Sequence, residues 1–194
     1  MTIGGIVLAG GAGRRLGRPK AGVVLDGRTL VERAVETLRP HCGTLLVVSR
    51  PEVELPRLDA TVCFDRPGPD APLNALATGL AALDTGDVLV LACDLPSAQP
   101  VVDRLVLAPT GTAAVARDRS SRQWQPLCAR YPRWAALDAC ERLLASGELR
   151  LLPLVDALRP AAIDASTEEL ANVNSPRDLA RLTALTRPAE PGGC

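Results

Sequence analysis

The hydrophobic residues of this chain form two kinds of run that alternate along its first half. Short continuous runs of Ile, Val and Leu predict buried strands, whereas apolar residues spaced three or four positions apart predict helices. The predicted strands are residues 3–9, 44–49, 60–64 and 87–93, and the predicted helices begin at residues 30 and 73. A capping box at Thr29 and Glu32 opens the first helix, and Pro40 ends it. This alternation predicts a parallel sheet that is covered on both faces.

The second half of the chain is less regular. Its pattern predicts strands at 112–116 and 123–131 around a polar turn, helices at 133–146 and 152–158, a last strand at 160–163, and a final helix capped by Ser175. We therefore expect an α/β fold, a single-domain, three-layer Rossmann-like sandwich with a mostly parallel sheet and a small β-hairpin insertion in the C-terminal half. Residues 1–186 are expected to form this domain, and residues 187–194 a Pro/Gly-rich flexible tail.

Charge and composition exclude several classes of protein. The 194 residues are 47% hydrophobic with zero formal net charge, so the chain has a core but no global field that would attract nucleic acid or an anionic membrane. No apolar run is long enough to span a bilayer, and the N-terminus lacks a basic-then-apolar signal pattern. A cytoplasmic protein with neither nucleic acid nor membrane as its partner is expected.

The cysteines do not predict a metal or redox site. There are six of them and one histidine, without a C-x-x-C pair or zinc-site spacing. Cys63 and Cys93 lie in apolar runs, where a cysteine behaves as a small hydrophobic residue. A nucleophilic pair at His41 and Cys42 stays open as an alternative, although adjacency in sequence is not catalytic geometry.

A glycine-rich segment, residues 8–20, follows the first predicted strand. Its glycines let backbone N–H groups approach a ligand, and its arginines and Lys20 add positive charge, a combination that suits a polyphosphate. Lys20 is the only lysine in the chain, which favours a specific role for its compact charge. The segment is neither a P-loop, because Ala21 follows the lysine, nor a dinucleotide fingerprint, because Leu16 takes the third glycine position.

Two aspartates stand at the ends of other predicted strands. Ligands of open parallel sheets bind outside the carboxyl ends of the strands, so Asp65, Asp94 and the glycine-rich segment are expected to share one site. A carboxylate such as Asp94 suits Mg²⁺ that also carries phosphates, and Asp65 could accept a hydrogen bond from a ribose or a guanine N–H group. The structural alternatives are a helix N-cap for Asp94 and a turn before Pro67 for Asp65.

The pattern L-A-G-G-x-x-x-R-x-G-x-x-K at residues 8–20 resembles the signature loop of sugar-nucleotide and cofactor nucleotidyltransferases. Within that superfamily the chain most resembles the molybdenum cofactor guanylyltransferases. The similar stretches are Cys93–Pro96 (C-D-x-P), Gln125–Leu127 with Tyr131 (Q-P-L-x-x-x-Y), Gly147–Arg150 (G-E-R-R) and Asn172–Pro176 (N-x-N-T-P). The last stretch favours the guanylyl branch, because the related cytidylyltransferases usually have D-x-D there.

This resemblance implies a role for each matching residue. It implies nucleotide binding through the backbone at Leu8, Ala9, Gly10 and Gly11, triphosphate binding by Arg14 and Lys20, guanosine binding by Asp65, and GTP and Mg²⁺ binding by Asp94. Lys20, Arg14 and Asp94 would be the catalytic residues. It also implies that Asn172 and Asn174 lie near the reacting phosphates, and that Gln125, Arg150 and Arg117, Arg119 or Arg122 line a pterin-side pocket.

The expected activity is Mg²⁺-dependent transfer of GMP from GTP to the terminal phosphate of molybdopterin, with release of pyrophosphate. Cofactor-delivery proteins are candidate partners. Three departures from the family pattern affect substrate identity: residues 68–73 lack the usual Gly-Pro-Leu-Ala-Gly, Ser49 replaces an asparagine, and Leu149 replaces an arginine. A relative that uses CTP or another phosphorylated acceptor, and a non-catalytic nucleotide-binding homologue, therefore stay open as alternatives.

Overall fold

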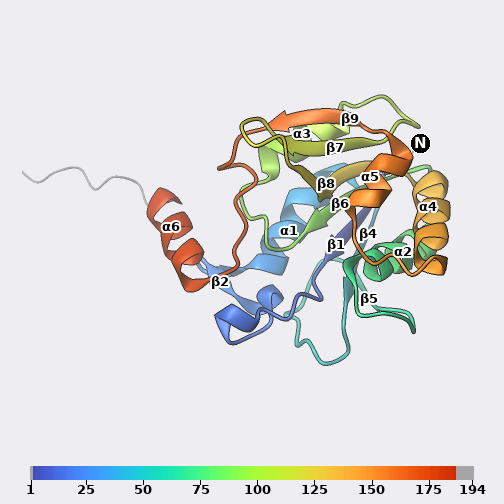
Figure 1. The fold of residues 1–194 in the computed structure, drawn as a ribbon. Helices are drawn as coiled ribbons and strands as arrows, with labels where there is room; N and C mark the ends of the chain where they lie inside the picture. Colours follow the sequence, from blue (N-terminus) through green and yellow to red (C-terminus); the bar gives the residue numbers. More distant parts are fainter. Residues whose placement is uncertain (1, 187–194) are drawn as a thin grey trace, which may run out of the picture.

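A seven-stranded sheet forms the centre of the molecule in the computed structural model, which describes residues 2–186 (Figure 1). Its strands, in spatial order, are β5 (Thr61–Phe64), β4 (Thr44–Ser49), β1 (Gly4–Leu8), β6 (Asp87–Ala92), β8 (Trp124–Pro132), β7 (Ala114–Asp118) and β9 (Ala161–Ala165). Strand β8 runs antiparallel to both of its neighbours, and all the other neighbouring strands are parallel. The expected mostly parallel sheet is therefore confirmed, and the predicted hairpin of β7 and β8 is part of this main sheet.

Helices cover both faces of the sheet, as the continuous apolar strands predict. Helices α1 (Leu30–Leu38) and α3 (Gln99–Val106) pack on one face, and α2 (Pro72–Ala82), α4 (Arg133–Ala145) and α5 (Leu152–Leu158) pack on the other. Successive residues of β1 point to opposite faces, so Val7 lies in the first apolar layer and Ile6 in the second. Both side chains are fully buried. The three-layer architecture is thus confirmed.

A third, smaller apolar cluster lies beside the sheet. It joins the two-stranded ribbon of β2 (Val24–Leu25) and β3 (Arg28–Thr29) to Val173 and to α6 (Pro176–Thr186). Short 3₁₀ turns complete the described chain at Arg14–Leu16, Lys20–Gly22 and Arg39–His41. The predicted capping box of α1 is present, since Glu32 N donates to Thr29 Oγ1 and Thr29 N donates to the Glu32 carboxylate.

The structure differs from the sequence-based prediction at β7, at α3 and at the ribbon β2–β3. Strand β7 extends to Asp118, so the polar turn is shorter than predicted and begins at Arg119. Helix α3 and the ribbon β2–β3 were not predicted. The tail at residues 187–194 lies outside the described residues. Among residues 2–186 no helix is both long and apolar enough to cross a lipid bilayer.

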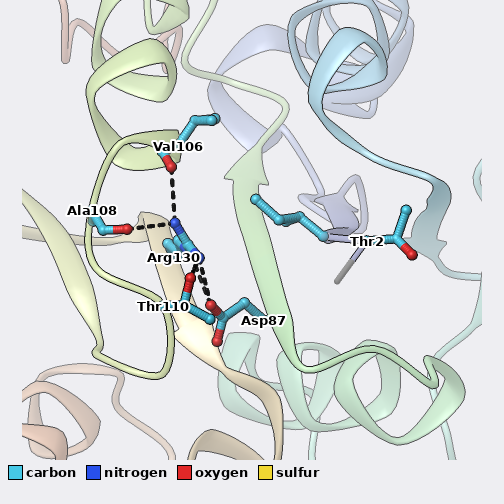
Figure 2. Close-up of a pocket in the computed structure, with 7 residues that line it drawn as sticks. Thr2, Asp87, Val106, Ala108, Thr110 and Arg130 are labelled. Atoms are coloured by element: carbon cyan, nitrogen blue, oxygen red, sulfur yellow. Dashed lines mark hydrogen bonds and ion pairs between the residues drawn. The ribbon is translucent and has the colours of Figure 1, made fainter.

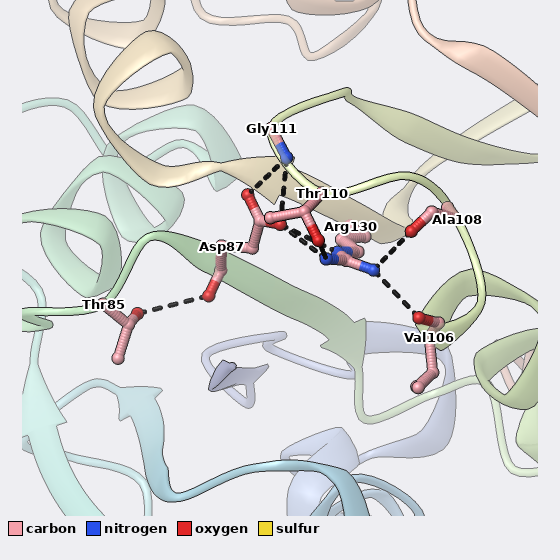
Figure 3. A network of polar contacts seen from close by, with 7 residues as sticks. All are labelled: Thr85, Asp87, Val106, Ala108, Thr110, Gly111 and Arg130. Carbon is pink, nitrogen blue, oxygen red and sulfur yellow. Dashed lines mark hydrogen bonds and ion pairs between the residues drawn. The ribbon is translucent and has the colours of Figure 1, made fainter. Parts of the chain in front are cut away.

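A buried ion pair joins β6 and β8 at the end of the sheet where the parallel strands begin (Figures 2 and 3). Asp87 opens β6, and its carboxylate accepts from Arg130 Nε at 3.1 Å, from Arg130 Nη2 at 2.6 Å and from Gly111 N at 3.2 Å. The remaining N–H groups of Arg130 donate to the Val106 and Ala108 carbonyls and to Thr110 Oγ1. A cavity of about 330 Å³ lies beside this pair, and the lining residues Asp87, Thr110 and Arg130 are already hydrogen-bonded to one another. We interpret this network as structural.

Candidate active site

The glycine-rich segment leaves the carboxyl end of β1 and folds back on itself. Gly13 has a φ of 57°, and a Cβ there would overlap the carbonyl oxygen of Arg18, so the turn requires glycine at this position. Lys20 N then donates to Gly11 O at 3.1 Å, which brings the lysine alongside the start of the segment. The fold thus places one cation directly over the glycines.

Lys20 is the centre of a polar cluster built from three distant parts of the chain. Its Nζ donates to Asp94 Oδ2 at 2.6 Å and also to Asn174 Oδ1. Asp94 follows the end of β6, and its backbone carbonyl accepts from Val173 N at 2.9 Å, which fixes the position of the neighbouring Asn174. Asp94 is not a helix N-cap, because α3 begins only after Ala98. The structure therefore brings together three residues that the sequence proposed for phosphate and metal binding.

A pocket of about 430 Å³ lies between this cluster and the ends of β4 and β5. Leu8, Gly10, Gly11, Arg14, Lys20 and Asp94 line it near β1 and β6, and Arg50, Asp65, Asp70 and Pro72 line it near β4 and β5. Ala9 does not line the pocket: its side chain is buried in the core, and its N–H donates to Val48 O at 2.8 Å. The pocket thus has a cationic, glycine-lined end and a second end that contains two carboxylates.

Asp65 has unused bonding capacity in this pocket. Its Oδ1 is buried without a hydrogen-bond partner among the described residues, and burial raises the pKa of the carboxyl above its ordinary value of 3.8. The nearby Ser49 Oγ is also buried and unpartnered. Because buried polar atoms are normally paired, an unpaired acceptor that lines a cavity indicates a ligand with N–H or O–H donors. A turn-forming role would not leave this oxygen free.

The segment that carries Asp65 and Asp70 is held firmly despite its unusual sequence. Asn74 accepts from Arg66 Nε at 3.1 Å and donates to Arg66 O at 3.1 Å, and Thr78 Oγ1 accepts from Arg66 N at 3.2 Å. The Arg66 guanidinium also binds Glu141 on α4 with a shortest distance of 2.6 Å. Residues 65–71 are therefore anchored to α2 and α4, although the segment keeps Gly68 and lacks the second glycine of the family pattern.

A second pocket of about 400 Å³ lies on the other side of Asn174. Gln125 and Asn172 line it together with Trp124, Asp118 and Arg181, and Asn172 Oδ1 is buried without a partner among the described residues. The sequence-based prediction placed Gln125 and Asn172 near a substrate but did not find the other three. Asn174 belongs to this pocket and is bonded to Lys20, so it connects the two cavities.

The arginines proposed for the pterin side line neither of these two pockets, and their role stays a prediction. Arg117 pairs with Asp164 at 2.9 Å and lies over the Trp124 ring at 5.1 Å. Arg150 pairs with Glu148 at 2.7 Å on the surface and holds the pKa of that carboxyl at about 2. Arg119 and Arg122 are likewise absent from both linings. Arg122 lies 3.9 Å from Asp164 at the surface.

Cysteine chemistry is not favoured at this site. Burial raises the pKa of Cys93, which lines the first pocket, to about 12, and it raises the pKa of Cys42 to about 12 as well. A nucleophilic cysteine must be a thiolate near neutral pH, so neither residue is suited to that role. This disfavours the His41–Cys42 alternative.

The donor set fits a divalent cation that is delivered with phosphates. The described residues contain no group of three or more His, Cys, Asp or Glu side chains that could hold a metal by themselves. Asp94 offers a carboxylate, and Asn174 and Asn172 offer amide oxygens close by. Mg²⁺ commonly binds proteins through one or two carboxylates and completes its octahedron with phosphate oxygens and water. Nucleotidyl transfer generally uses a divalent metal, and these residues fit that requirement.

Comparison with known proteins identifies the family. Residues 5–161 match the family model described as the MobA-like NTP transferase domain. This chain belongs to that family. It is 35% identical over 193 residues to the probable molybdenum cofactor guanylyltransferase of Chloroflexus aggregans, covering 92% of each chain. It is 36% identical over 195 residues to the molybdenum cofactor guanylyltransferase of Cereibacter sphaeroides, covering 96% of this chain and 98% of the relative.

Solved structures share the fold at lower identity. Molybdopterin-guanine dinucleotide biosynthesis protein A from Archaeoglobus fulgidus superimposes with a TM-score of 0.73 at 24% identity, covering 94% of this chain and 98% of that one. The 2-C-methyl-D-erythritol 4-phosphate cytidylyltransferase from Thermus thermophilus superimposes with a TM-score of 0.74 at 22% identity, covering 95% and 98%. These two likenesses show the fold. The family match and the two curated relatives show that the protein is an enzyme of the nucleotidyltransferase class.

Proposed function

We propose that this enzyme transfers GMP from GTP to the terminal phosphate of molybdopterin and releases pyrophosphate. One observation carries the proposal: a pocket that joins the Lys20–Asp94–Asn174 cluster to the unpartnered carboxylate of Asp65. The first end suits a metal-bound triphosphate, and the second suits a base with N–H donors. The names of the two curated relatives support GTP as the nucleotide and the molybdenum cofactor as the acceptor.

Positioning and charge neutralisation account for catalysis in this arrangement. A phosphate oxygen of the acceptor attacks the α-phosphorus of GTP, the bond from that phosphorus to the bridging oxygen of the β-phosphate breaks, and pyrophosphate leaves with its electron pair. Lys20, Arg14 and the N–H groups near Gly10 and Gly11 stabilise the charge that develops on the leaving group. Mg²⁺ held by Asp94 would supply further neutralisation of the phosphates. No side chain needs to act as a general base, because the acceptor phosphate is already ionised.

The acceptor is proposed to bind in the pocket that contains Gln125, Trp124 and Asn172. That pocket adjoins the cluster through Asn174, so a phosphate from this side can approach the nucleotide without crossing the nucleoside end. Asn172 Oδ1 and Gln125 offer polar contacts for a pterin, whose ring carries N–H groups. Proteins that deliver or receive the cofactor remain candidate partners.

A nucleotide titration tests this function first. Calorimetry with GTP, CTP, ATP and UTP, each with Mg²⁺, should show selective binding of GTP, and Asp94→Asn should weaken it by about tenfold or more, as expected when a metal ligand is lost. Asp138→Asn on the exposed face of α4 is the matched control, because Asp138 pairs only with Arg142 on its own helix. When molybdopterin is added with GTP, the wild-type protein should release pyrophosphate from GTP, and the Asp94→Asn variant should not. A preference for CTP would contradict the proposal and indicate a cytidylyl relative.

A further inference from the structure

Arg50 and Asp70 face each other across the nucleoside end of the first pocket. Arg50 directly follows β4, and its Cγ and Nε lie 3.5 Å from the position that a Cβ on Gly10 would occupy. Its Nη2 donates to Asp70 Oδ1, and both residues line the pocket with Asp65. Arg50 lies outside the short motifs that carry the family resemblance, and Asp70 lies in the segment 68–73 that departs from the family pattern.

The sheet order places Arg50, at the end of β4, between the strand that leads into the glycine-rich segment and the strand that ends at Asp65. Lys20 and Asp94 stand at the ends of β1 and β6, whereas Arg50 and Asp65 stand at the ends of β4 and β5. Neighbouring strands are about 4.8 Å apart, so the step from β6 across β1 and β4 to β5 spans roughly 14 Å. A nucleotide whose phosphates contact Lys20 therefore directs its base toward Arg50 and Asp65.

Arg50 also has hydrogen-bonding capacity to spare. Asp70 is the only hydrogen-bond partner of its side chain among the described residues, while all five N–H groups of Arg130 at the other edge of the sheet are used. The Asp70 side chain is 68% exposed, and an exposed ion pair holds its partner weakly. The guanidinium can therefore exchange Asp70 for a ligand with little loss.

The two charged groups complement the two edges of guanine. Guanine presents the acceptors O6 and N7 on one edge, and Arg is the side chain that most often binds this pair with its two parallel N–H groups. Its N1–H and exocyclic amine are donors that match the unpartnered carboxylate of Asp65. Adenine and cytosine present an amine donor where guanine presents O6, so the Arg50 fork disfavours both.

We infer that Arg50 is a base-specificity residue of this enzyme, which recognises O6 and N7 of guanine after exchanging its Asp70 partner for the nucleotide. This inference rests on the proposed use of GTP, and it adds the residue by which this chain distinguishes guanine from other bases. The changed residues 68–73 then have a counterpart, because they include Asp70, the exchangeable partner of Arg50 at the pocket.

Two arginine variants and one modified nucleotide test the role of Arg50. Dissociation constants of GTP, 7-deaza-GTP and ATP, each with Mg²⁺, are measured for the wild type, Arg50→Ala and Arg50→Lys. The wild type should bind GTP more tightly than 7-deaza-GTP, which lacks N7. Arg50→Ala should lose about 5- to 100-fold in GTP affinity and should bind GTP and 7-deaza-GTP equally. Arg50→Lys should also lose the distinction, because a lysine keeps the charge without the fork.

Two further variants separate recognition from folding. Asp70→Asn should bind GTP at least as tightly as the wild type, because it releases Arg50, and Arg142→Ala on α4 is the matched surface control. Equal loss for GTP, ATP and 7-deaza-GTP in Arg50→Ala would overturn the inference and indicate a phosphate contact. A loss in Asp70→Asn as large as in Arg50→Ala would overturn it in favour of a structural ion pair. A wild type without GTP preference would overturn the proposed function as well, whereas a GTP preference that persists in Arg50→Ala would overturn only the inference.

Discussion

Replacing Asp87 with alanine should destabilise the fold without weakening the nucleotide pocket. The side chains of Asp87 and Arg130 are 5% and 4% exposed, and within residues 2–186 the Asp87 carboxylate is the only negative charge bonded to that guanidinium (Figure 3). In Asp87→Ala the Arg130 guanidinium stays buried and keeps its hydrogen bonds to two carbonyls and one hydroxyl, but it loses its counter-charge. Breaking a buried pair by removing one partner typically costs about 3–5 kcal/mol, because the remaining charge is uncompensated.

This loss should be large enough to measure by thermal unfolding. A chain of this size loses about 2–4 °C in Tm for each kcal/mol, so Asp87→Ala should lower Tm by roughly 6–20 °C. The double variant Asp87→Ala/Arg130→Met should lose less than the single variant, since it removes the stranded charge too. Asp138→Ala, which breaks an exposed i,i+4 pair on α4, is the control and should lose at most about 0.5 kcal/mol.

The same variant should leave GTP binding intact. Asp87 and Asp94 stand at opposite ends of β6, about 20 Å apart at the rise of an extended strand. Calorimetry well below the lowered Tm should therefore give a GTP affinity within about threefold of the wild type, which is under 1 kcal/mol. A Tm shift no larger than that of Asp138→Ala, or a tenfold loss of GTP affinity, would refute the assignment of this network as structural.

Three other predictions concern the pocket itself. Lys20→Met should lower kcat about 10²- to 10³-fold in a pyrophosphate-release assay, as expected when a preorganised charge on the leaving group is lost. Gly13→Ala should weaken GTP binding about tenfold or more by calorimetry, because a Cβ would collide with the Arg18 carbonyl and displace the segment. Burial raises the pKa of Asp65, so its ionised form opposes folding. Asp65→Asn should therefore raise Tm at pH 7 and weaken GTP binding. The gain in Tm should vanish as the pH falls toward 3.8, because the wild-type carboxyl is then protonated as well.

Local signals in the sequence were sufficient for most of the fold. The strands that became β4 and β6 are continuous apolar runs, and α1 has an explicit capping box, so each element is specified by neighbouring residues. Helix α3 was missed although its sequence carries a signal: Pro100 stands in its first turn, and the buried Val101, Val102 and Leu105 have helical spacing. The ribbon β2–β3 has two residues in each strand, too few for any periodicity.

The site was predictable only where a motif or a strand end marked it. Strand topology indicated that Lys20 and Asp94 would be close, because both follow parallel strands that are neighbours in the sheet. Arg50 and Asp70 carried no signal, since a lone arginine and a lone aspartate in polar segments are normally solvated. Arg150 shows the converse: its motif matched, but the side chain pairs with Glu148 at the surface and lines neither pocket.

The two aspartates that flank β6 show why bonding capacity, and not residue type, separates a structural charge from a functional one. Asp87 faces an arginine whose five donors are all used, so moving either partner leaves a buried group unpaired. Asp94 faces a single lysine at 2.6 Å on a side chain that lines a cavity, so its partner can be exchanged. In the proposed reaction Lys20 would follow the phosphates and Asp94 would hold their metal, so that each charge keeps a partner. Exchange of this kind needs a pocket next to the ion pair, and the described structure provides one at the carboxyl end of β6.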